Sequence, residues 1–149
     1  MVGDLASLQP SLRRLSLEHC SLTLEWLLAS CLSSLPPSLP SPPWSSLSSL
    51  TVQHCSLSSL GPALQHAPAL TSLDCSHNRL TCSAGLEALA HLSCLLLAYN
   101  LLASLPCLHP EAPLTVLAMA YNRLEQVAGL EVLPCLLHLD VSGTTSVIL

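Results

Sequence analysis

Histidine and cysteine are the side chains in this sequence best suited to catalysis or metal binding. The 149 residues include seven His and eight Cys. Two pairs are adjacent, His19-Cys20 and His54-Cys55. A thiol beside an imidazole can act as a nucleophile, and the two groups together can supply ligands to a zinc ion. Whether these side chains can cooperate depends on the elements that carry them.

Six segments of the chain align without gaps and define those elements. Five fit the pattern L-x-x-L-x-L-x-x-N/C-x-L, with Leu, Val, Cys or Met at position 6, and the sixth departs from it at its last two key positions. Their starts are 35, 23, 22, 22 and 22 residues apart, which indicates a repeat even in a chain with 39 Leu. The segments are LRRLSLEHCSL from Leu12, LSSLTVQHCSL from Leu47, LTSLDCSHNRL from Leu70, LSCLLLAYNLL from Leu92, LTVLAMAYNRL from Leu114 and LLHLDVSGTTS from Leu136.

The alternation within each segment predicts a short β-strand with two different faces. Positions 4 and 6 share one face, and stacked parallel neighbours would bury them in a continuous core. The predicted buried pairs are Leu15/Leu17, Leu50/Val52, Leu73/Cys75, Leu95/Leu97, Leu117/Met119 and Leu139/Val141. Position 9 can donate hydrogen bonds to the buried carbonyls of the turns, and it holds Cys20, Cys55, Asn78, Asn100, Asn122 and Thr144.

The segments between the strands predict short turns in place of long helices. From Leu124 to Leu139 the apolar residues fall at every third position, a period that suits 3-10 turns. Proline opposes long helices and recurs here, at Pro62, Pro68, Pro106, Pro110, Pro113 and Pro134. The pattern resembles the 22-residue class of the leucine-rich-repeat family. This resemblance implies an α/β fold, a right-handed solenoid with a concave parallel β-sheet and short 3-10 or helical returns.

The repeats cover nearly the whole chain, so we expect one leucine-rich-repeat domain over residues 1–149. The first return is longer than the others. In it we expect two helical turns over Leu24–Cys31 and an extended surface loop, rich in Pro and Ser, over residues 33–46. Solenoids need polar capping units at their ends, so the abrupt start and the apolar end SVIL predict a fragment of a longer protein.

The order of several short motifs indicates a narrower resemblance. LEWLLASC, a Pro-Trp stretch, HNRL, YNLL and YNRLEQVAGLEVL together resemble the repeat region of the serine/threonine kinase 11-interacting protein family. The resemblance implies a scaffold that binds a signalling serine/threonine kinase. The 22-residue class is also typified by a phosphatase-regulating scaffold, so a subunit that steers a phosphatase is an alternative. A purely structural segment without a ligand is another.

The predicted strands argue against catalysis by the His-Cys pairs. Adjacent residues of a strand point to opposite sides, and a thiol in a Leu core is unreactive because burial raises its pKa. The sequence shows no nucleophile elbow, phosphate loop or paired-carboxylate motif, so we expect neither enzymatic activity nor a cofactor.

Position 8 would form a ladder along the rim of the sheet. Three interpretations are open: rings that pack on one another, a contact strip for a partner, and a zinc site that also uses a neighbouring Cys. The ladder residues are His19, His54, His77, Tyr99, Tyr121 and Gly143.

Positions 3, 5 and 7 point away from the core, and we expect them to bind a protein partner. They are polar in the first three units, apolar and small in the fourth and fifth, and polar again in the sixth. A solvated sheet does not need Leu96 and Val116 facing outward together, although single exposed aliphatic side chains are common. The candidate contact residues are Arg14, Glu18, Gln53, Asp74, Leu96, Val116, His138 and Asp140, with Tyr99 and Tyr121 at the rim.

Charge and composition exclude several other kinds of partner. Four basic residues, all Arg, stand against nine acidic ones, so a phosphate-dominated nucleic-acid interface is not expected. No apolar run reaches the roughly 18 residues of a membrane span, and the first residues show no signal-peptide pattern. Eight Cys without a Cys-x-x-Cys pair then predict reduced thiols and a cytoplasmic location.

Overall fold

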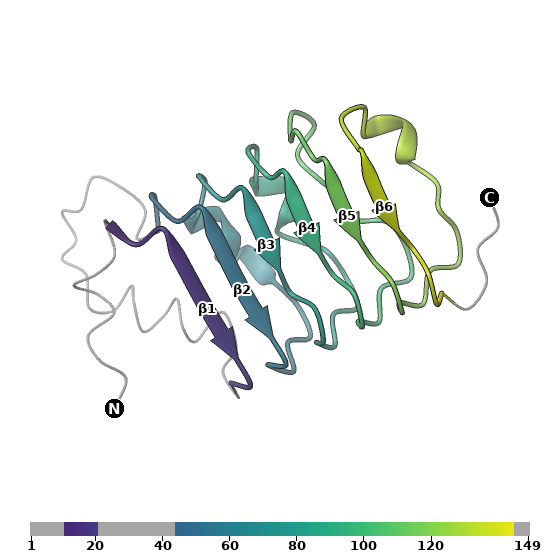
Figure 1. Cartoon of the computed structure of the whole chain (residues 1–149), viewed down its shortest axis with the longest axis horizontal. Helices are drawn as coiled ribbons and strands as arrows, with labels where there is room; N and C mark the ends of the chain where they lie inside the picture. Colours follow the sequence, from purple (N-terminus) through teal and green to yellow (C-terminus); the bar gives the residue numbers. More distant parts are fainter. Residues whose placement is uncertain (1–10, 21–43, 145–149) are drawn as a thin grey trace.

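Six short strands form one parallel sheet in the computed structural model, which describes residues 11–20 and 44–144. The sheet order follows the chain, and Figure 1 shows the strands side by side with the return segments behind them. The predicted α/β solenoid with a parallel sheet is confirmed. The strands are β1 (Arg14–Glu18), β2 (Ser49–Gln53), β3 (Ser72–Asp74), β4 (Cys94–Leu96), β5 (Val116–Ala118) and β6 (His138–Asp140).

The strand register places equivalent positions of neighbouring repeats opposite one another. Leu73 on β3, for example, lies opposite Leu95 on β4. A slip of one residue would turn every leucine of a strand out of the core, so the apolar pattern strongly specifies this register.

Hydroxyl side chains at position 2 support the same register. The backbone N–H groups of Thr71 and Ser72 donate to the carbonyl oxygen of Ser48, at 2.9 and 3.0 Å. The Thr71 hydroxyl donates to that oxygen as well, at 3.0 Å. The equivalent hydroxyl bond to the preceding unit is made by Ser48, Ser93 and Thr115.

The core lies between the sheet and the returns, and it is deepest in the middle of the chain. Four predicted pairs are fully buried: Leu50/Val52, Leu73/Cys75, Leu95/Leu97 and Leu117/Met119. The prediction is wrong for the two outer pairs, Leu15/Leu17 and Leu139/Val141, which are only half-buried. Within the described residues, β1 and β6 each have a neighbouring strand on one side only, so nothing covers the other side of these pairs.

The side chains at position 9 hydrogen-bond the turns as expected. The Asn100 Oδ1 accepts the N–H of Leu80 at 3.0 Å. Its Nδ2 donates to the carbonyls of Cys75, Leu97 and Ala98, and Asn78 and Asn122 make equivalent sets of bonds. Cys20, Cys55 and Thr144 donate to a turn carbonyl of their own unit. Buried carbonyls such as those of Cys75 and Leu97, which each accept bonds from two asparagines, are thereby satisfied.

The returns contain the predicted 3-10 turns: η2 (Gly61–His66), η3 (Leu86–Ala88) and η4 (Leu130–Val132). Glycine precedes η3 and η4 in a left-handed conformation, with φ of 103° at Gly85 and 97° at Gly129. Other residues adopt such angles only with strain. The helical turns expected over Leu24–Cys31 lie outside the described residues, as do residues 33–43 of the expected loop.

Trp44 corrects the prediction at the end of that loop. It was expected on the surface, yet only 1% of its side chain is exposed. The backbone N–H of Trp44 donates to the His66 carbonyl at 3.2 Å, and the backbone carbonyl of Trp44 accepts the N–H of Leu47 at 3.0 Å. The indole therefore belongs to the core, because a large apolar ring gains more from burial than from a surface position.

Candidate binding surface

The solvent side of the sheet, which we call the concave face, carries positions 3, 5 and 7 of each strand. Its composition changes along the solenoid, whereas the core side repeats the same residue types. Arg14 and Glu18 lie on β1 and are exposed, and the Glu18 carboxylate accepts a bond from the Ser16 hydroxyl at 3.5 Å. These two charged candidates stand several strands away from the apolar candidates on β4 and β5.

Five small or aliphatic residues on the fourth and fifth units form what we call the apolar patch. The register places Cys94 opposite Val116 and Leu96 opposite Ala118. The predicted candidates Leu96 and Val116 are thus diagonal neighbours, and both are half-buried because strands flank them on either side. The apolar patch consists of Cys94, Leu96, Ala98, Val116 and Ala118.

Position 7 is less open than the alternation predicted. Ser76 is 8% exposed and Ala120 is 6% exposed, although both were expected on the solvent side. Strands β3 and β5 end at position 5, so the chain has already begun to turn at position 7. The Ser76 N–H is drawn into this turn by a 3.0 Å bond to Asp74 Oδ1.

Asp74 stands on one side of the apolar patch with both carboxylate oxygens bonded. Its Oδ1 accepts the Ser76 N–H, and its Oδ2 accepts a hydrogen bond from Gln53 Nε2 at 2.6 Å. The candidates Gln53 and Asp74 are therefore brought together, and both side chains are half-buried.

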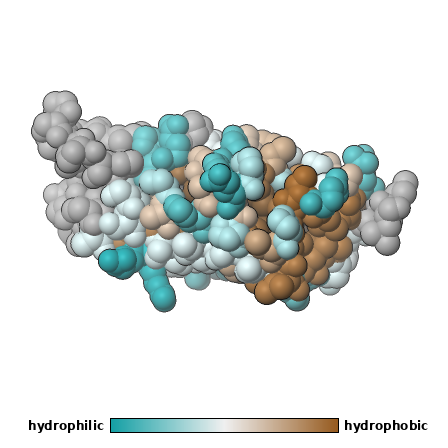
Figure 2. Space-filling view, turned by 90° about the horizontal axis from the view of Figure 1, so that it is seen from above, coloured by the Kyte–Doolittle hydropathy of each residue, from teal (hydrophilic) through white to brown (hydrophobic). Residues whose placement is uncertain are grey.

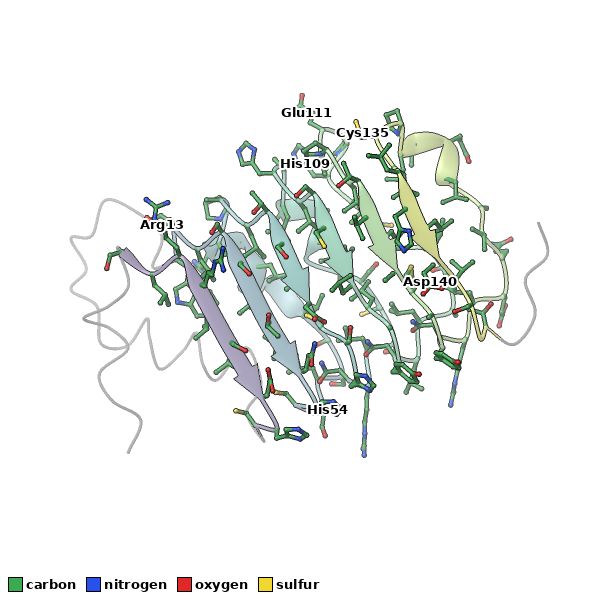
Figure 3. All side chains as sticks on the ribbon, in the orientation of Figure 1. Arg13, His54, His109, Glu111, Cys135 and Asp140 are labelled. Carbon is green, nitrogen blue, oxygen red and sulfur yellow. The ribbon has the colours of Figure 1, made fainter. Side chains whose placement is uncertain are left out.

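Asp140 stands on the other side of the apolar patch, near the C-terminal end of the sheet (Figure 3). The Ser142 N–H donates to its Oδ1 at 3.0 Å, and this bond lowers the pKa of the Asp140 carboxyl below its ordinary value. His138, two residues earlier on β6, adds a smaller effect in the same direction. The structure thus gives the apolar patch a fixed carboxylate on each side.

The ladder at position 8 is present as a continuous stack of rings. Successive ring centroids from His19 to Tyr121 are 4.6, 4.3, 4.4 and 4.5 Å apart, and neighbouring planes differ by at most 17°. All five residues have φ between 53° and 57°, a left-handed conformation that costs about 1 kcal/mol each. Stacking contributes about 0.5–1.5 kcal/mol per pair and offsets this strain. The packing interpretation is thereby supported, while Tyr99 and Tyr121 are still 46% and 52% exposed.

The chain is similar to a curated protein over most of its length. No family model matches the chain. A curated relative, the serine/threonine-protein kinase 11-interacting protein of Gallus gallus, is 35% identical over 134 residues, which is 88% of this chain and 12% of that protein. The chain has the architecture of a leucine-rich-repeat solenoid. It spans only about an eighth of the length of this relative.

A solved leucine-rich-repeat structure also resembles the chain. It is the crystal structure of the leucine-rich repeat domain of APL1B, with 23% sequence identity and a TM-score of 0.41. The match covers 76% of this chain and 46% of that one.

Two cysteines of the chain are buried in the core as structural groups. Burial raises the pKa of the thiols of Cys55 and Cys75, which face the core. The zinc interpretation finds no support in residues 11–20 and 44–144, which contain no cluster of three or more His, Cys, Asp or Glu side chains arranged for a metal. No helix of that part is long and apolar enough to cross a membrane.

A second apolar area, on the last repeat, was missed. Leu137 is 86% exposed and Val132 is 68% exposed. Figure 2 looks down on the edge of the sheet where the strands begin, and it shows an apolar area toward the C-terminal end. The alignment carried a signal, because Leu137 occupies position 2, where the other repeats have Arg13, Ser48, Thr71, Ser93 and Thr115.

Proposed function

We propose that this chain is a non-enzymatic module that binds a protein partner through its concave face. The observation that carries the proposal is the apolar patch on β4 and β5. Core packing explains the Leu, Asn and ring positions of these repeats, but it does not explain why Cys94, Leu96, Val116 and Ala118 face solvent together. Desolvation of such a patch by a partner is favourable, at about 25 cal/mol per Å² of apolar surface.

The repeats suit this role because they hold the binding side chains in place before a partner arrives. Strands, asparagine bonds and stacked rings order the concave face, so little conformational entropy is lost on binding. Rigid display of this kind needs no catalytic group.

We infer that the partner is a signalling serine/threonine kinase. The support is the name of the relative in Gallus gallus, which describes an interaction with such a kinase. A phosphatase in the same role would identify the chain as a regulatory subunit.

The experiment is affinity purification with the 149-residue chain, followed by kinase and phosphatase assays on the bound material. Leu96→Glu combined with Val116→Glu places two charges in the apolar patch and should reduce recovery of the partner at least tenfold. Ala103→Glu combined with Ala128→Glu adds two charges at exposed positions of the returns and should leave recovery unchanged. Equal recovery with both double variants would contradict the proposed surface.

We also propose that the chain works in the reducing cytoplasm. The seven cysteines in the described part of the chain are all free thiols. Thiol counting on denatured protein purified without reductant should give close to eight groups, and two or more disulfides would overturn this location.

A further inference from the structure

One row of the concave face has two apolar residues between two acidic ones. The strand register places Asp74 directly opposite Leu96, Leu96 opposite Ala118, and Ala118 opposite Asp140. These four residues occupy position 5 on β3, β4, β5 and β6. The row therefore reads acidic, apolar, apolar, acidic across four adjacent strands.

The two carboxylates are held in place by neutral hydrogen-bond donors. Hydrogen bonds from Gln53 and Ser76 orient Asp74, and a bond from Ser142 orients Asp140. Within the part of the chain that the structure describes, no arginine forms an ion pair with either aspartate. Arg14, the arginine on the concave face, lies on β1, two strands beyond β3. The attraction of both carboxylates is therefore available to an external cation.

The spacing of the row defines which segment can use both charges. Neighbouring strands lie about 4.8 Å apart, so three spacings separate Asp74 from Asp140 by about 14 Å. An extended peptide advances about 3.3 Å per residue, and residues two apart point to the same side. Residues i and i+4 of an extended segment therefore span about 13 Å and face the sheet together with residue i+2. A helix rises about 1.5 Å per residue and would need about nine residues for a comparable distance.

We propose that the concave face binds an extended segment of its protein partner, laid across the strands, with the pattern basic-x-aliphatic-x-basic. The two basic side chains pair with Asp74 and Asp140, and the central aliphatic side chain packs on Leu96 and Ala118. This inference rests on the proposed function, because it specifies which chemistry the same surface recognises.

The test is a nuclear magnetic resonance titration of the isotope-labelled 149-residue chain with short capped peptides at pH 8, where imidazoles are neutral. The probe contains Lys-Ala-Leu-Ala-Lys. Its comparison peptides replace both Lys by Glu, replace Leu by Ser, or separate the two Lys by seven residues. The probe should shift the amides of β3 to β6 and bind at least threefold more tightly than each comparison peptide.

Substitutions in the chain test whether Asp74 and Asp140 are the groups that bind the two Lys side chains. Asp74→Asn and Asp140→Asn should each weaken binding of the probe about two- to fivefold, the size expected for an exposed ion pair. Glu131→Gln removes an exposed carboxylate from the last return and should leave binding unchanged. The loss of affinity for the probe that each aspartate variant shows should be smaller at 0.5 M salt, because salt screens the ion pairs.

The results separate this inference from the proposed function. If the Glu peptide binds the concave face as tightly as the probe, the inference is overturned. The same holds if the widely spaced Lys peptide binds more tightly, or if no peptide shifts β3 to β6. The proposed function fails on a different result, namely that Leu96→Glu with Val116→Glu retains the partner in affinity purification.

Discussion

The fourth and sixth repeats share the apolar pattern of the strand but have different surroundings. In the fourth, Leu95 and Leu97 are fully buried, and Asn100 bonds three carbonyls and one N–H group. In the sixth, the equivalent Leu139 and Val141 are half-buried, and Thr144 donates one bond. The contribution of a residue to the stability of the fold therefore depends on the units stacked on either side of it and not on the pattern alone.

The largest difference between the two repeats is expected for the position 4 leucines. Leu95→Ala should lower the free energy of unfolding by about 3–5 kcal/mol, because it leaves a cavity in a fully packed core. Leu139→Ala removes a half-buried side chain, and its cost should be about 1–2 kcal/mol. Denaturant unfolding followed by circular dichroism measures both. Equal costs would mean that the last repeat is packed as tightly as the fourth.

Two equivalent glycines, one in a middle return and one in an outer return, differ in the space around them. Gly85 and Gly129 have similar left-handed angles, so alanine strains the backbone at both by about 1–2 kcal/mol. At Gly85 an added Cβ would also overlap the Gly61 carbonyl oxygen, whereas at Gly129 it meets no atom within 4 Å. Gly85→Ala should therefore destabilise the chain by about 3 kcal/mol, clearly more than Gly129→Ala. Thermal unfolding of the two variants would contradict this if their midpoints were the same.

A smaller difference is expected at position 9. Asn100→Ala removes the acceptor of the buried Leu80 N–H and one donor from each of three carbonyls, and it should cost about 2–3 kcal/mol. Thr144→Ala removes one bond at a half-buried site and should cost less than about 1 kcal/mol. Amide hydrogen exchange can check the location of the effect, since the Leu80 N–H bonds to Asn100 and should lose protection in the first variant only.

The features that repeat were predictable from sequence, and those that depend on neighbours were not. Register, the four buried pairs of the middle units, the asparagine bonds and the ring stack follow from residue types at fixed positions. The half-burial at β1 and β6, and the burial of Trp44, depend on which units happen to be adjacent. The left-handed angles of the ladder were also missed, because His and Tyr rarely adopt them.

The sequence predicted which side of the sheet forms the concave face, but not how exposed each of its side chains is. The alternation identified which side chains leave the core, yet Ser76 and Ala120 proved to be buried where the strands end. The register places four residues in one row, namely Asp74, Leu96, Ala118 and Asp140. The gapless alignment of the repeats already contained this register.

The most direct test of the account is calorimetric titration of the isolated 149-residue chain with its purified partner. Six strands at about 4.8 Å spacing and three positions per strand offer on the order of 250–400 Å², less than half the roughly 800 Å² per partner of a standard interface. We therefore expect a dissociation constant in the micromolar range or weaker, raised at least tenfold by Leu96→Glu with Val116→Glu. A nanomolar constant that this double variant leaves unchanged would show that the partner binds elsewhere.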